Sequence, residues 1–592
     1  MPSHLYRKSC SVIVLGTLLF SAGGYSESCA AQFSQPETYP ISSEVFTTRQ
    51  QTIQPAPKPS QEILLHEVAK YKQYGYGAWT YGKGIDDGKR TDIMPVGYTG
   101  SAAVKKAKLL NFFAFTDIHT TDKESPSQLI YLQQLMYPGM NKAPYAFMTS
   151  IYSPIMLYTP HVLDAAVQTV NALHKKEPID FGISLGDTCN STQYNELRWY
   201  IDVLDGKVIK PSSGAHAGAT TIDYQKPFKA AGLDKTIPWY QTMGNHDHFW
   251  LGSIPMDEAL RKSYISDTIF ASSDVLANPA NIHKPDYYMG VLDGSTPYGD
   301  IKGAGPVGKF ISAPKVVADP DRRSLSKTEW MQEFFKTTSK PIGHGFNLID
   351  AKNGFSCYSF VPKANVPLKV IVLDDTQRED DGSKRIHGHG YLDKARWAWL
   401  KKELSDGQAK GQLMVIAAHI PLKVEKPTSE MAWWQDPQNA VTEDELINEL
   451  QKHPNFMLWI SGHRHMNTVK AFVSADPVNA PERGFWQVET SSLRDFPQQF
   501  RTFQIYLNSD NTVSIVTTNV DPAVKEGTPA AKSRSYAVAA QQIINNDIYN
   551  VNPNKDPSIK PMPTGSYNAE LLKLLTPEMQ RKLKKLFMSA GM

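Results

Sequence analysis

Residues 109–119 read Leu-Leu-Asn-Phe-Phe-Ala-Phe-Thr-Asp-Ile-His, a short apolar run that ends next to Asp117 and His119. A short apolar run bounded by polar residues predicts a strand that is buried on both faces. Five similar runs follow it along the chain: 179–185, 237–243, 368–373, 413–417 and 456–460. Amphipathic segments at 162–173 and 393–404 predict helices between them. This alternation of strands and helices predicts an α/β fold.

Residues able to bind metal follow five of these runs. The five motifs are Thr116-Asp117-Ile118-His119, Gly186-Asp187-Thr188, Gly244-Asn245-His246-Asp247, Ala418-His419-Ile420-Pro421 and Gly462-His463-Arg464-His465. Ligands of α/β sheets gather beyond the carboxyl ends of strands, which is where these motifs fall. Carboxylate, imidazole and amide donors suit Fe, Zn or Mn, and the motifs themselves contain no thiolate. The ordered set therefore predicts a metal site.

Single motifs of this kind arise by chance. The triplet His387-Gly388-His389 occurs in a Gly-rich loop of the same chain, and we interpret it as structural. Taken alone, His419 before Ile-Pro is more typical of a buried core histidine than of a ligand. It is the order of all five motifs at successive strand ends that favours a ligand.

The ordered motifs resemble those of the calcineurin-like metallophosphoesterase family from Asp117 to His465, and the strand pattern extends the resemblance to about residue 520. The segment 390–400, which leads towards His419, is also similar to the family's approach to its fourth motif. The resemblance implies a four-layer α-β-β-α sandwich with long insertions and a C-terminal helical tail. It also implies two bound divalent or trivalent transition-metal ions, Fe, Zn or Mn.

The resemblance implies a role for each residue of the motifs. Seven would be metal ligands in two groups that share the bridging Asp187: Asp117, His119 and His465 for one ion, and Asn245, His419 and His463 for the other. His246 would donate a proton to the leaving group, and Asp247 would fix the tautomer of that imidazole. The implied reaction is phosphoester hydrolysis by a hydroxide that bridges the two ions, so no Ser or Cys nucleophile is required.

Several neighbouring residues refine this interpretation. Glycines precede Asp187, Asn245 and His463, and we expect them to let the backbone pass close to the metals. Purple acid phosphatases place a metal-binding Tyr where this chain has Asn190, so a tyrosinate-coordinated ferric site is not expected. Asp247 stands where 5′-nucleotidase relatives usually have Glu, which disfavours a nucleotidase.

Three further residues near the motifs have two interpretations each. The sequon Asn190-Ser191-Thr192 is interpreted as chance because it adjoins the metal site. Arg464 either points at phosphate or lies on the surface, and it is not assigned a catalytic role. Cys189 is interpreted as a small buried hydrophobic residue rather than a reactive thiol.

The composition excludes few functions, but it indicates how large a hydrophobic core the chain can form and which partners it favours. The chain has 592 residues, is 41% hydrophobic, and can bury one large core or two modest ones without disulfides. A formal net charge of +3 indicates no specific nucleic acid partner, so the expected partner is a phosphoester substrate. The oligomeric state stays open.

The N-terminus predicts export. Arg7 and Lys8 precede one apolar run at 11–20, so residues 1–31 are typical of a secretory signal peptide, with a buried helix as the alternative. This run is shorter than the roughly 20 apolar residues that span a bilayer, and no later run is longer. We therefore expect a periplasmic or secreted protein without a transmembrane segment in the mature chain. Only Cys189 and Cys357 then remain, too few for a disulfide framework.

The chain after residue 31 divides into three regions. Residues 32–105 predict a linker followed by a packing helix near 62–79, and 106–520 the metallophosphoesterase domain. Insertions at 206–235 and 248–341 are either lids that shape the substrate cleft or surface decoration.

The region 521–592 forms a C-terminal extension in this division. Before it, residues 503–519 predict a hairpin, and within it residues 571–587 predict a basic amphipathic helix. We expect this helix to dock by its apolar face, and membrane binding is the alternative.

Three functions remain in competition. Phosphomonoester and phosphodiester hydrolysis use the same metals, so the choice between them is open. A catalytically weak metal- or phosphate-binding protein of the same fold is the alternative, which the complete ligand set with His246 disfavours. A metallo-β-lactamase-like hydrolase would show a His-x-His-x-Asp-His signature, and the sequence has none.

Overall fold

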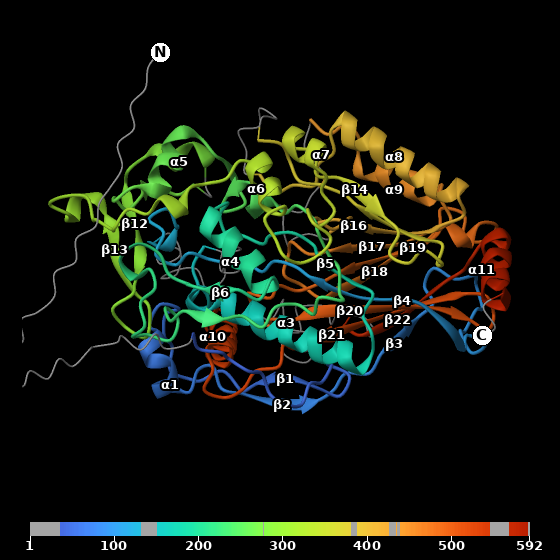
Figure 1. Ribbon diagram of the computed structural model, residues 1–592, viewed down its shortest axis with the longest axis horizontal. Coiled ribbons are helices and arrows are strands. Elements are labelled where there is room, and N and C mark those ends of the chain that lie inside the picture. The colour runs from blue at the N-terminus through green and yellow to red at the C-terminus, as the bar shows by residue number, and fades with distance from the viewer. Residues whose placement is uncertain are drawn as a thin grey trace, which may run out of the picture. The chain divides into compact units, whose positions relative to one another are not determined.

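The six strands predicted from apolar runs are all present in the computed structural model, three in each of two sheets (Figure 1). The structure describes residues 36–131, 151–275, 278–379, 387–424, 434, 438–544 and 567–589. The predicted signal peptide at 1–31 lies outside these described residues. The compact unit that carries both sheets begins at Glu37. Among the described residues, no helix combines the length and apolar character needed to cross a membrane.

The seven-stranded sheet has the order β3-β22-β21-β20-β4-β5-β8. Its strands are β3 Gly88–Arg90, β22 Ala569–Lys573, β21 Val513–Val520, β20 Phe500–Asn508, β4 Lys105–Phe115, β5 Phe181–Ser184 and β8 Trp239–Gln241. Because β4, β5 and β8 run parallel, their carboxyl ends lie at one edge of the sheet. The first three motifs follow these three ends.

The six-stranded sheet has the order β14-β15-β16-β17-β19-β18. Its strands are β14 Tyr358–Phe360, β15 Leu368–Val372, β16 Leu413–Ala417, β17 Phe456–Ser461, β19 Phe485–Glu489 and β18 Thr468–Phe472. The four strands from β15 to β19 in this order run parallel. The fourth and fifth motifs follow the neighbouring ends of β16 and β17.

A common hydrophobic core joins the two sheets. It takes alternate residues from β4, β5, β20 and β21 of one sheet and from β15, β16, β17 and β19 of the other. Phe112 stacks between Phe181 and Phe503, with ring centroids 4.7 and 4.8 Å away. Burial of this much apolar surface is the main force that holds the sheets together.

Helices cover the other faces of the two sheets. They are α3 Thr159–Lys176 and α4 Tyr194–Leu204 against β4, and α8 Lys394–Ala409 and α9 Glu443–Gln451 against β15 and β16. In Figure 1 the yellow-orange α8 and α9 lie together, and the teal α3 lies on the opposite side of the strands. Both predicted helices, 162–173 and 393–404, are confirmed as α3 and α8. Asp393 caps α8 by accepting a hydrogen bond from the Arg396 N–H.

The insertion at 248–341 is more regular than the sequence suggests. It contains β9 Phe249–Trp250, β10 Ile254–Pro255, α5 Glu258–Ile265, β11 Ala271–Ser272, β12 Tyr287–Asp293, β13 Asp300–Pro306 and α6 Lys327–Glu333. Strands β11, β12 and β13 form their own sheet. Gly290, Gly303 and Gly305 have positive φ within β12 and β13 and interrupt the alternation that would have revealed these strands. The insertion at 206–235 has the two-residue strands β6 Val208–Ile209 and β7 Phe228–Lys229 and a 3₁₀ turn at Gly214–His216.

The predicted packing helix near 62–79 is much shorter than expected. It consists of a 3₁₀ turn at Val68–Lys70 and α1 Tyr71–Tyr74, flanked by the paired strands β1 Gln51–Pro55 and β2 Trp79–Lys83. Gly75 in the left-handed region ends α1. Its apolar side chains nevertheless pack as predicted, because Leu65, Val68 and Tyr71 share a hydrophobic cluster with α10 Pro529–Ile544.

The C-terminal predictions are confirmed in part. The hairpin is present as the antiparallel pair β20 and β21. The predicted helix at 571–587 begins too early, because Leu571 belongs to β22 and the helix, α11, spans Pro577–Ser589. Met579 and Leu583 of α11 enter the core between the sheets, whereas Lys584 is exposed. The helix thus docks by its apolar face. One further short helix, α7 Leu348–Asn353, precedes β14.

Candidate metal centre

The turns that carry the predicted ligands have unusual backbone geometry. Five non-glycine residues there have positive φ: Asp117 (49°), His119 (45°), Asp187 (55°), His463 (74°) and His465 (58°). Such conformations are uncommon outside glycine and concentrate at functional sites, where surrounding structure holds them in place. The surrounding structure therefore holds these turns in conformations that set the direction of the Asp and His side chains.

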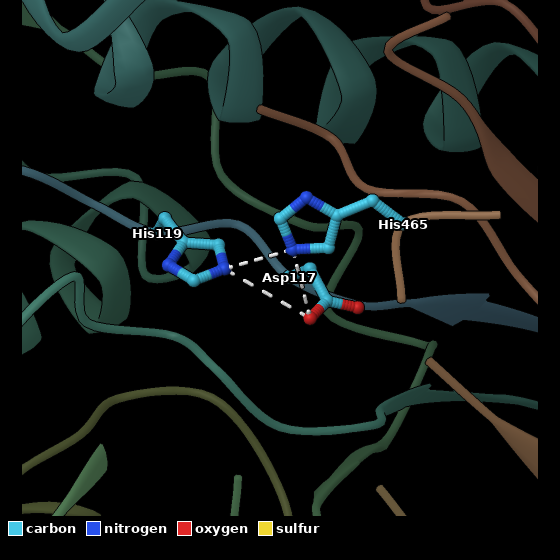
Figure 2. Close-up of side chains that lie close together, drawn as sticks. All are labelled: Asp117, His119 and His465. Atoms are coloured by element: carbon cyan, nitrogen blue, oxygen red, sulfur yellow. Dashed lines mark hydrogen bonds and ion pairs between the residues drawn. The ribbon is translucent and has the colours of Figure 1, made fainter. Parts of the chain in front are cut away.

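Asp117, His119 and His465 form a first group of donors. Figure 2 shows the three side chains pointing toward one another from the loops after β4 and β17. The Nε2 atoms of His119 and His465 are 3.1 Å apart, and Asp117 Oδ1 lies 3.9 and 3.3 Å from them. Asp117 Oδ1 is buried and has no hydrogen-bond partner within the described part of the chain. A buried carboxylate oxygen of this kind indicates a site for a cation.

Asn245, His419 and His463 form a second group. Asn245 Oδ1 lies 2.8 Å from His419 Nε2 and 3.1 Å from His463 Nδ1, and these two nitrogens are 3.2 Å apart. The Asn245 side-chain amide donates to the Gly252 carbonyl at 2.8 Å, which turns its oxygen towards the imidazoles. His419 Nδ1 donates to the Leu185 carbonyl at 2.8 Å and so leaves Nε2 free to bind metal.

Asp187 lies between the two groups. Its Oδ2 is 3.7 Å from His119 Nε2 of the first group and 3.3 Å from His419 Nε2 of the second. Its Oδ1 accepts the His246 backbone N–H at 2.8 Å, which fixes the carboxylate plane. One carboxylate oxygen of Asp187 therefore faces both groups, a position from which it could bind an ion in each.

The residues of both groups fit transition-metal ions. Nitrogen and oxygen ligands bind such ions at about 2.0–2.2 Å, which places neighbouring donors roughly 3.0–3.6 Å apart. The donor pairs described above are 2.8–3.9 Å apart. The ligand atoms of Asp117, His119 and His465 and those of Asp187, His419 and His463 each lie within 4.8 Å of one another. The chain thus contains a cluster of His and Asp side chains able to hold metal.

Three glycines permit this close approach. A Cβ on Gly186 would lie 2.9 Å from His419 Nδ1, and one on Gly244 would overlap the Asp187 backbone and carboxylate. A Cβ on Gly462 would overlap Thr116 and Asp117. The prediction that glycines allow the backbone to pass close to the ligands is confirmed, because any larger residue would separate the motifs.

The partners of His246 and Asp247 differ from the prediction. His246 Nδ1 lies 2.6 Å from the Asn190 carbonyl oxygen and donates to it, so this backbone group fixes the tautomer. Asp247 instead accepts hydrogen bonds from the backbone N–H groups of Asp187, Thr188, Cys189 and Gly244. The expectation that Asp247 holds the His246 ring is wrong. Any oxygen with a free lone pair can accept the Nδ1 proton of His246, so a backbone carbonyl is sufficient to orient that ring. The turn after β5 presents several backbone N–H groups close together, and only a carboxylate can accept them all.

The carboxylates govern the protonation of the metal-free site. Burial opposes a charge on His419, but the Asp187 carboxylate outweighs it and raises the pKa of His419 to about 10. Asp117 likewise overcomes burial and raises the pKa of His465 to about 10. Burial lowers the pKa of His463 to about 3. One imidazole in each group therefore binds a proton where a metal ion would bind, so protons and metal ions compete for these nitrogens.

Two supporting carboxylates were not found from the sequence. Asp495 Oδ2 lies 2.6 Å from His465 Nδ1 and accepts its proton, a common support for metal-binding histidines. Asp375 accepts the backbone N–H groups of His419 and Ile420 at 3.0 and 2.9 Å. Asp375 follows the end of β15, so its position after a buried strand was an available signal. Asp495 lies in a loop without any such pattern.

Three ambiguous residues have structural partners. Arg464 forms a two-point ion pair with Glu489, and its side chain is only 9% exposed, so it does not lie on the surface. Cys189 is fully buried, and burial raises the pKa of its thiol well above the usual range, in keeping with a small hydrophobic residue. Asn190 is also fully buried and binds Gln128 and Arg494, so its sequon offers no accessible amide.

The His387-Gly388-His389 triplet takes a structural position. The Gly388 and His389 N–H groups donate to Gln377 Oε1 at 2.8 and 2.9 Å, and the His387 ring packs against Phe249. None of the metal-binding groups found among the described residues includes either histidine. The structural interpretation of this triplet agrees with these contacts.

Comparison with known proteins gives only weak likeness. No family model and no curated protein matches this sequence. Among solved structures, a dimetal phosphatase from Danio rerio is similar at 13% identity and a TM-score of 0.34, covering 70% of this chain and 98% of its own. The Thermus thermophilus sulfate thiohydrolase SoxB is similar at 13% identity and a TM-score of 0.28, covering 74% of this chain and 61% of its own. Likeness at this level assigns neither a fold family nor an activity.

Proposed function

We propose that the protein is a two-metal phosphoesterase of the calcineurin-like type, which hydrolyses phosphomonoesters or phosphodiesters. The observation that carries this proposal is the pair of donor groups on either side of Asp187 Oδ2, with a ring nitrogen of His246 within 4.8 Å of ligand atoms of His119 and Asp187. Two Fe, Zn or Mn ions bound there would activate water as a nucleophile and neutralise charge on the phosphoryl oxygens.

The chain's own residues would supply the remaining chemistry. His246 donates its Nδ1 proton to the Asn190 carbonyl, so a second proton on Nε2 is the one available to a leaving-group oxygen. Asp117 and Asp187 would provide two negative charges that neutralise part of the charge of the two cations. All of these side chains are buried, which strengthens the electrostatic interactions among them.

The proposal includes the fold and the cellular location. The packing of α3 and α4, the two sheets, and α8 and α9 supports the four-layer α-β-β-α sandwich that this class of enzyme uses. The basic start and the apolar run within residues 1–31 support export to the periplasm or beyond. The partner we propose is a phosphoester substrate, without a specific nucleic acid partner.

The test compares the two ester classes side by side. The mature chain, loaded in turn with Fe, Zn and Mn, is assayed on p-nitrophenyl phosphate and bis-p-nitrophenyl phosphate while bound metal is counted by elemental analysis. We expect two ions per chain and hydrolysis of at least one ester. A chain that holds two ions and hydrolyses neither ester would support the catalytically weak alternative.

Histidine variants make this test specific. His246→Gln should retain both ions and lower kcat by about 10²–10⁴-fold, the usual contribution of a general acid. His389→Gln serves as the matched control, because His389 belongs to the triplet outside the donor groups, and its kcat should equal that of the wild type. Equal activity of both variants would remove His246 from the mechanism.

A further inference from the structure

The loop between β19 and β20 reaches into the metal centre from outside the five motifs. We call Ser492–Asp495 the positioning loop; all four residues are buried. Ser492 Oγ donates to the Asp117 carbonyl at 2.6 Å, and the Leu493 N–H donates to the Thr116 carbonyl at 3.3 Å. The backbone of the first motif is thus tied to this loop at two successive residues.

Arg494 of the positioning loop connects to His246 through one intermediate residue. Its guanidinium donates to Asn190 Oδ1 at 2.6 Å, and the Asn190 carbonyl accepts the His246 Nδ1 proton at 2.6 Å. The Asn190 N–H donates to the Thr120 carbonyl at 2.9 Å, and its side-chain amide donates to Gln128 at 3.1 Å. Asn190 is therefore held at its N–H group and at both side-chain atoms.

These contacts restrain the residue whose carbonyl accepts the His246 Nδ1 proton. A carbonyl oxygen fixes an imidazole only as well as its own peptide is fixed. A hydrogen bond from a charged guanidinium is shorter and roughly twice as strong as a neutral one, so Arg494 restrains Asn190 more than Gln128 alone would. Removal of Arg494 would leave the Thr120, Gln128 and Glu196 contacts of this segment but would loosen Asn190, and with it the carbonyl that holds the His246 ring.

The unfavourable burial of the Arg494 charge also supports a role for this residue in orienting His246. Arg494 is 1% exposed, and burial disfavours its charge, lowering the pKa of its guanidinium. A buried ion is often no more stabilising than a well-packed hydrophobic residue of similar size. Stability alone thus gives little reason for an arginine here, whereas the orientation of a catalytic side chain does.

We propose that Arg494 is a positioning residue for His246: through Asn190 it fixes the carbonyl that holds Nδ1, and so aims Nε2 at the leaving-group oxygen. This inference rests on the proposed phosphoesterase function and deepens it. In this role Arg494 acts on His246 through Asn190, to whose Oδ1 atom it donates a hydrogen bond.

The first experiment separates positioning from general damage by the choice of leaving group. A p-nitrophenyl ester expels a stable anion that needs little protonation, whereas a phenyl ester depends on the acid. Arg494→Met should lower kcat on the phenyl ester by about a hundredfold and on the p-nitrophenyl ester by about threefold, with KM unchanged. The matched control is Arg534→Met, because Arg534 is another buried arginine and donates to the Pro522 carbonyl. This variant should leave kcat unchanged on both esters.

Other kinetic outcomes would overturn the proposal. Equal losses on both esters would mean that Arg494 acts on stability alone, and a large rise in KM would mean direct contact with phosphate. Arg494→Lys keeps the charge but replaces the planar guanidinium with a compact ammonium group, so it should show an intermediate selective loss of about tenfold. If Arg494→Met does not fold, the lysine variant decides: unchanged selectivity there would overturn the proposal.

A second experiment does not depend on activity. In metal-free protein labelled with ¹⁵N-histidine, His246 should give a downfield Nδ1 proton signal, assigned by its loss in His246→Gln. We expect this signal to broaden or vanish in Arg494→Met and to persist in Arg534→Met. Its persistence in Arg494→Met would contradict the proposal. A wild-type chain without esterase activity would count against the proposed function, while this signal would still test the link between Arg494 and His246.

Discussion

The two donor groups of the metal centre differ in charge and in what holds them. The first group contains the Asp117 carboxylate, whereas the second has the neutral Asn245 amide at the corresponding place. In the first group a side-chain carboxylate, Asp495, supports His465. In the second a backbone carbonyl, that of Leu185, supports His419. Both groups share Asp187.

This difference predicts unequal roles for ions bound at the two positions. An ion in the first group would have two carboxylates beside it and would be held more tightly. An ion in the second group would share only Asp187, so less of its charge would be neutralised and more would act on a substrate oxygen. We infer that the first position anchors the centre and the second acts more strongly as a Lewis acid.

The largest expected effect comes from removing what the groups share. Asp187→Ala should abolish binding of both ions, because it removes one negative charge from each position. Each ion contributes several kcal/mol of charge stabilisation to the reaction, so the loss in kcat should be at least about a thousandfold. Metal content by elemental analysis and kcat on the better p-nitrophenyl ester provide the measurement.

A matched control exists for this variant. Asp164 is another buried carboxylate, which accepts hydrogen bonds from Ala231 and Gln168 outside the metal centre. Asp164→Ala should keep both ions even if it lowers stability. Two tightly held ions and unchanged turnover in Asp187→Ala would remove the proposed bridge.

The five motifs were predictable because each ligand follows a buried strand, and both strand and ligand are local in sequence. The supports of the ligands were not. Asp495 lies 30 residues after His465 in a loop, so only tertiary folding brings them together. Every residue type has a backbone carbonyl, so a carbonyl partner leaves no trace in a sequence. The sequence therefore predicts Asp247, the nearest carboxylate along the chain, as the partner of His246, and this prediction is wrong because the Asn190 carbonyl takes that place.

The fold shows the same division between local and non-local information. Buried strands such as β16 match their apolar runs at both ends. In contrast, β3 has three residues without any apolar pattern, and it forms a strand only because β22 lies beside it. The positive-φ glycines of β12 and β13 concealed those strands, whose pairing depends on contacts that periodicity does not report.

The next largest effects are expected from changing the charge of one donor in each group. Asp117→Asn should lower the affinity of the first group for its ion by more than about a hundredfold, which exceeds the effect usual for a supporting residue. It should leave one ion per chain. Asn245→Asp should tighten the second ion and lower kcat, because the added charge reduces its Lewis acidity. Titration with a chelator and calorimetry measure both. Equal effects at the two positions would break the comparison between anchor and Lewis acid.

A smaller effect is expected from the support of His465. Asp495→Asn keeps an oxygen that can accept the Nδ1 proton but removes the negative charge, so affinity for one ion should fall by about 10–100-fold. The second ion should be unaffected. The measurement is the Kd of each ion, and loss of both ions together would mean that Asp495 supports the fold rather than one group.

The smallest effect concerns the metal-free protein, where the two groups should behave alike. The folded pKa values of His419 and His465 are both about 10, above the ordinary value of 6.5, so protonation of these rings stabilises the folded state. This stabilisation is fully present below pH 6.5 and is lost as the pH rises through about 10. Thermal unfolding without metal should therefore show a Tm that falls between pH 7 and 10 by a few degrees at most, because the unfolding entropy of a large chain is high.

In metal-loaded protein these nitrogens bind ions instead of protons, so this fall in Tm should disappear. His419→Gln and His465→Gln should each remove about half of it, and a fall that persists in both variants would place its origin outside the metal centre.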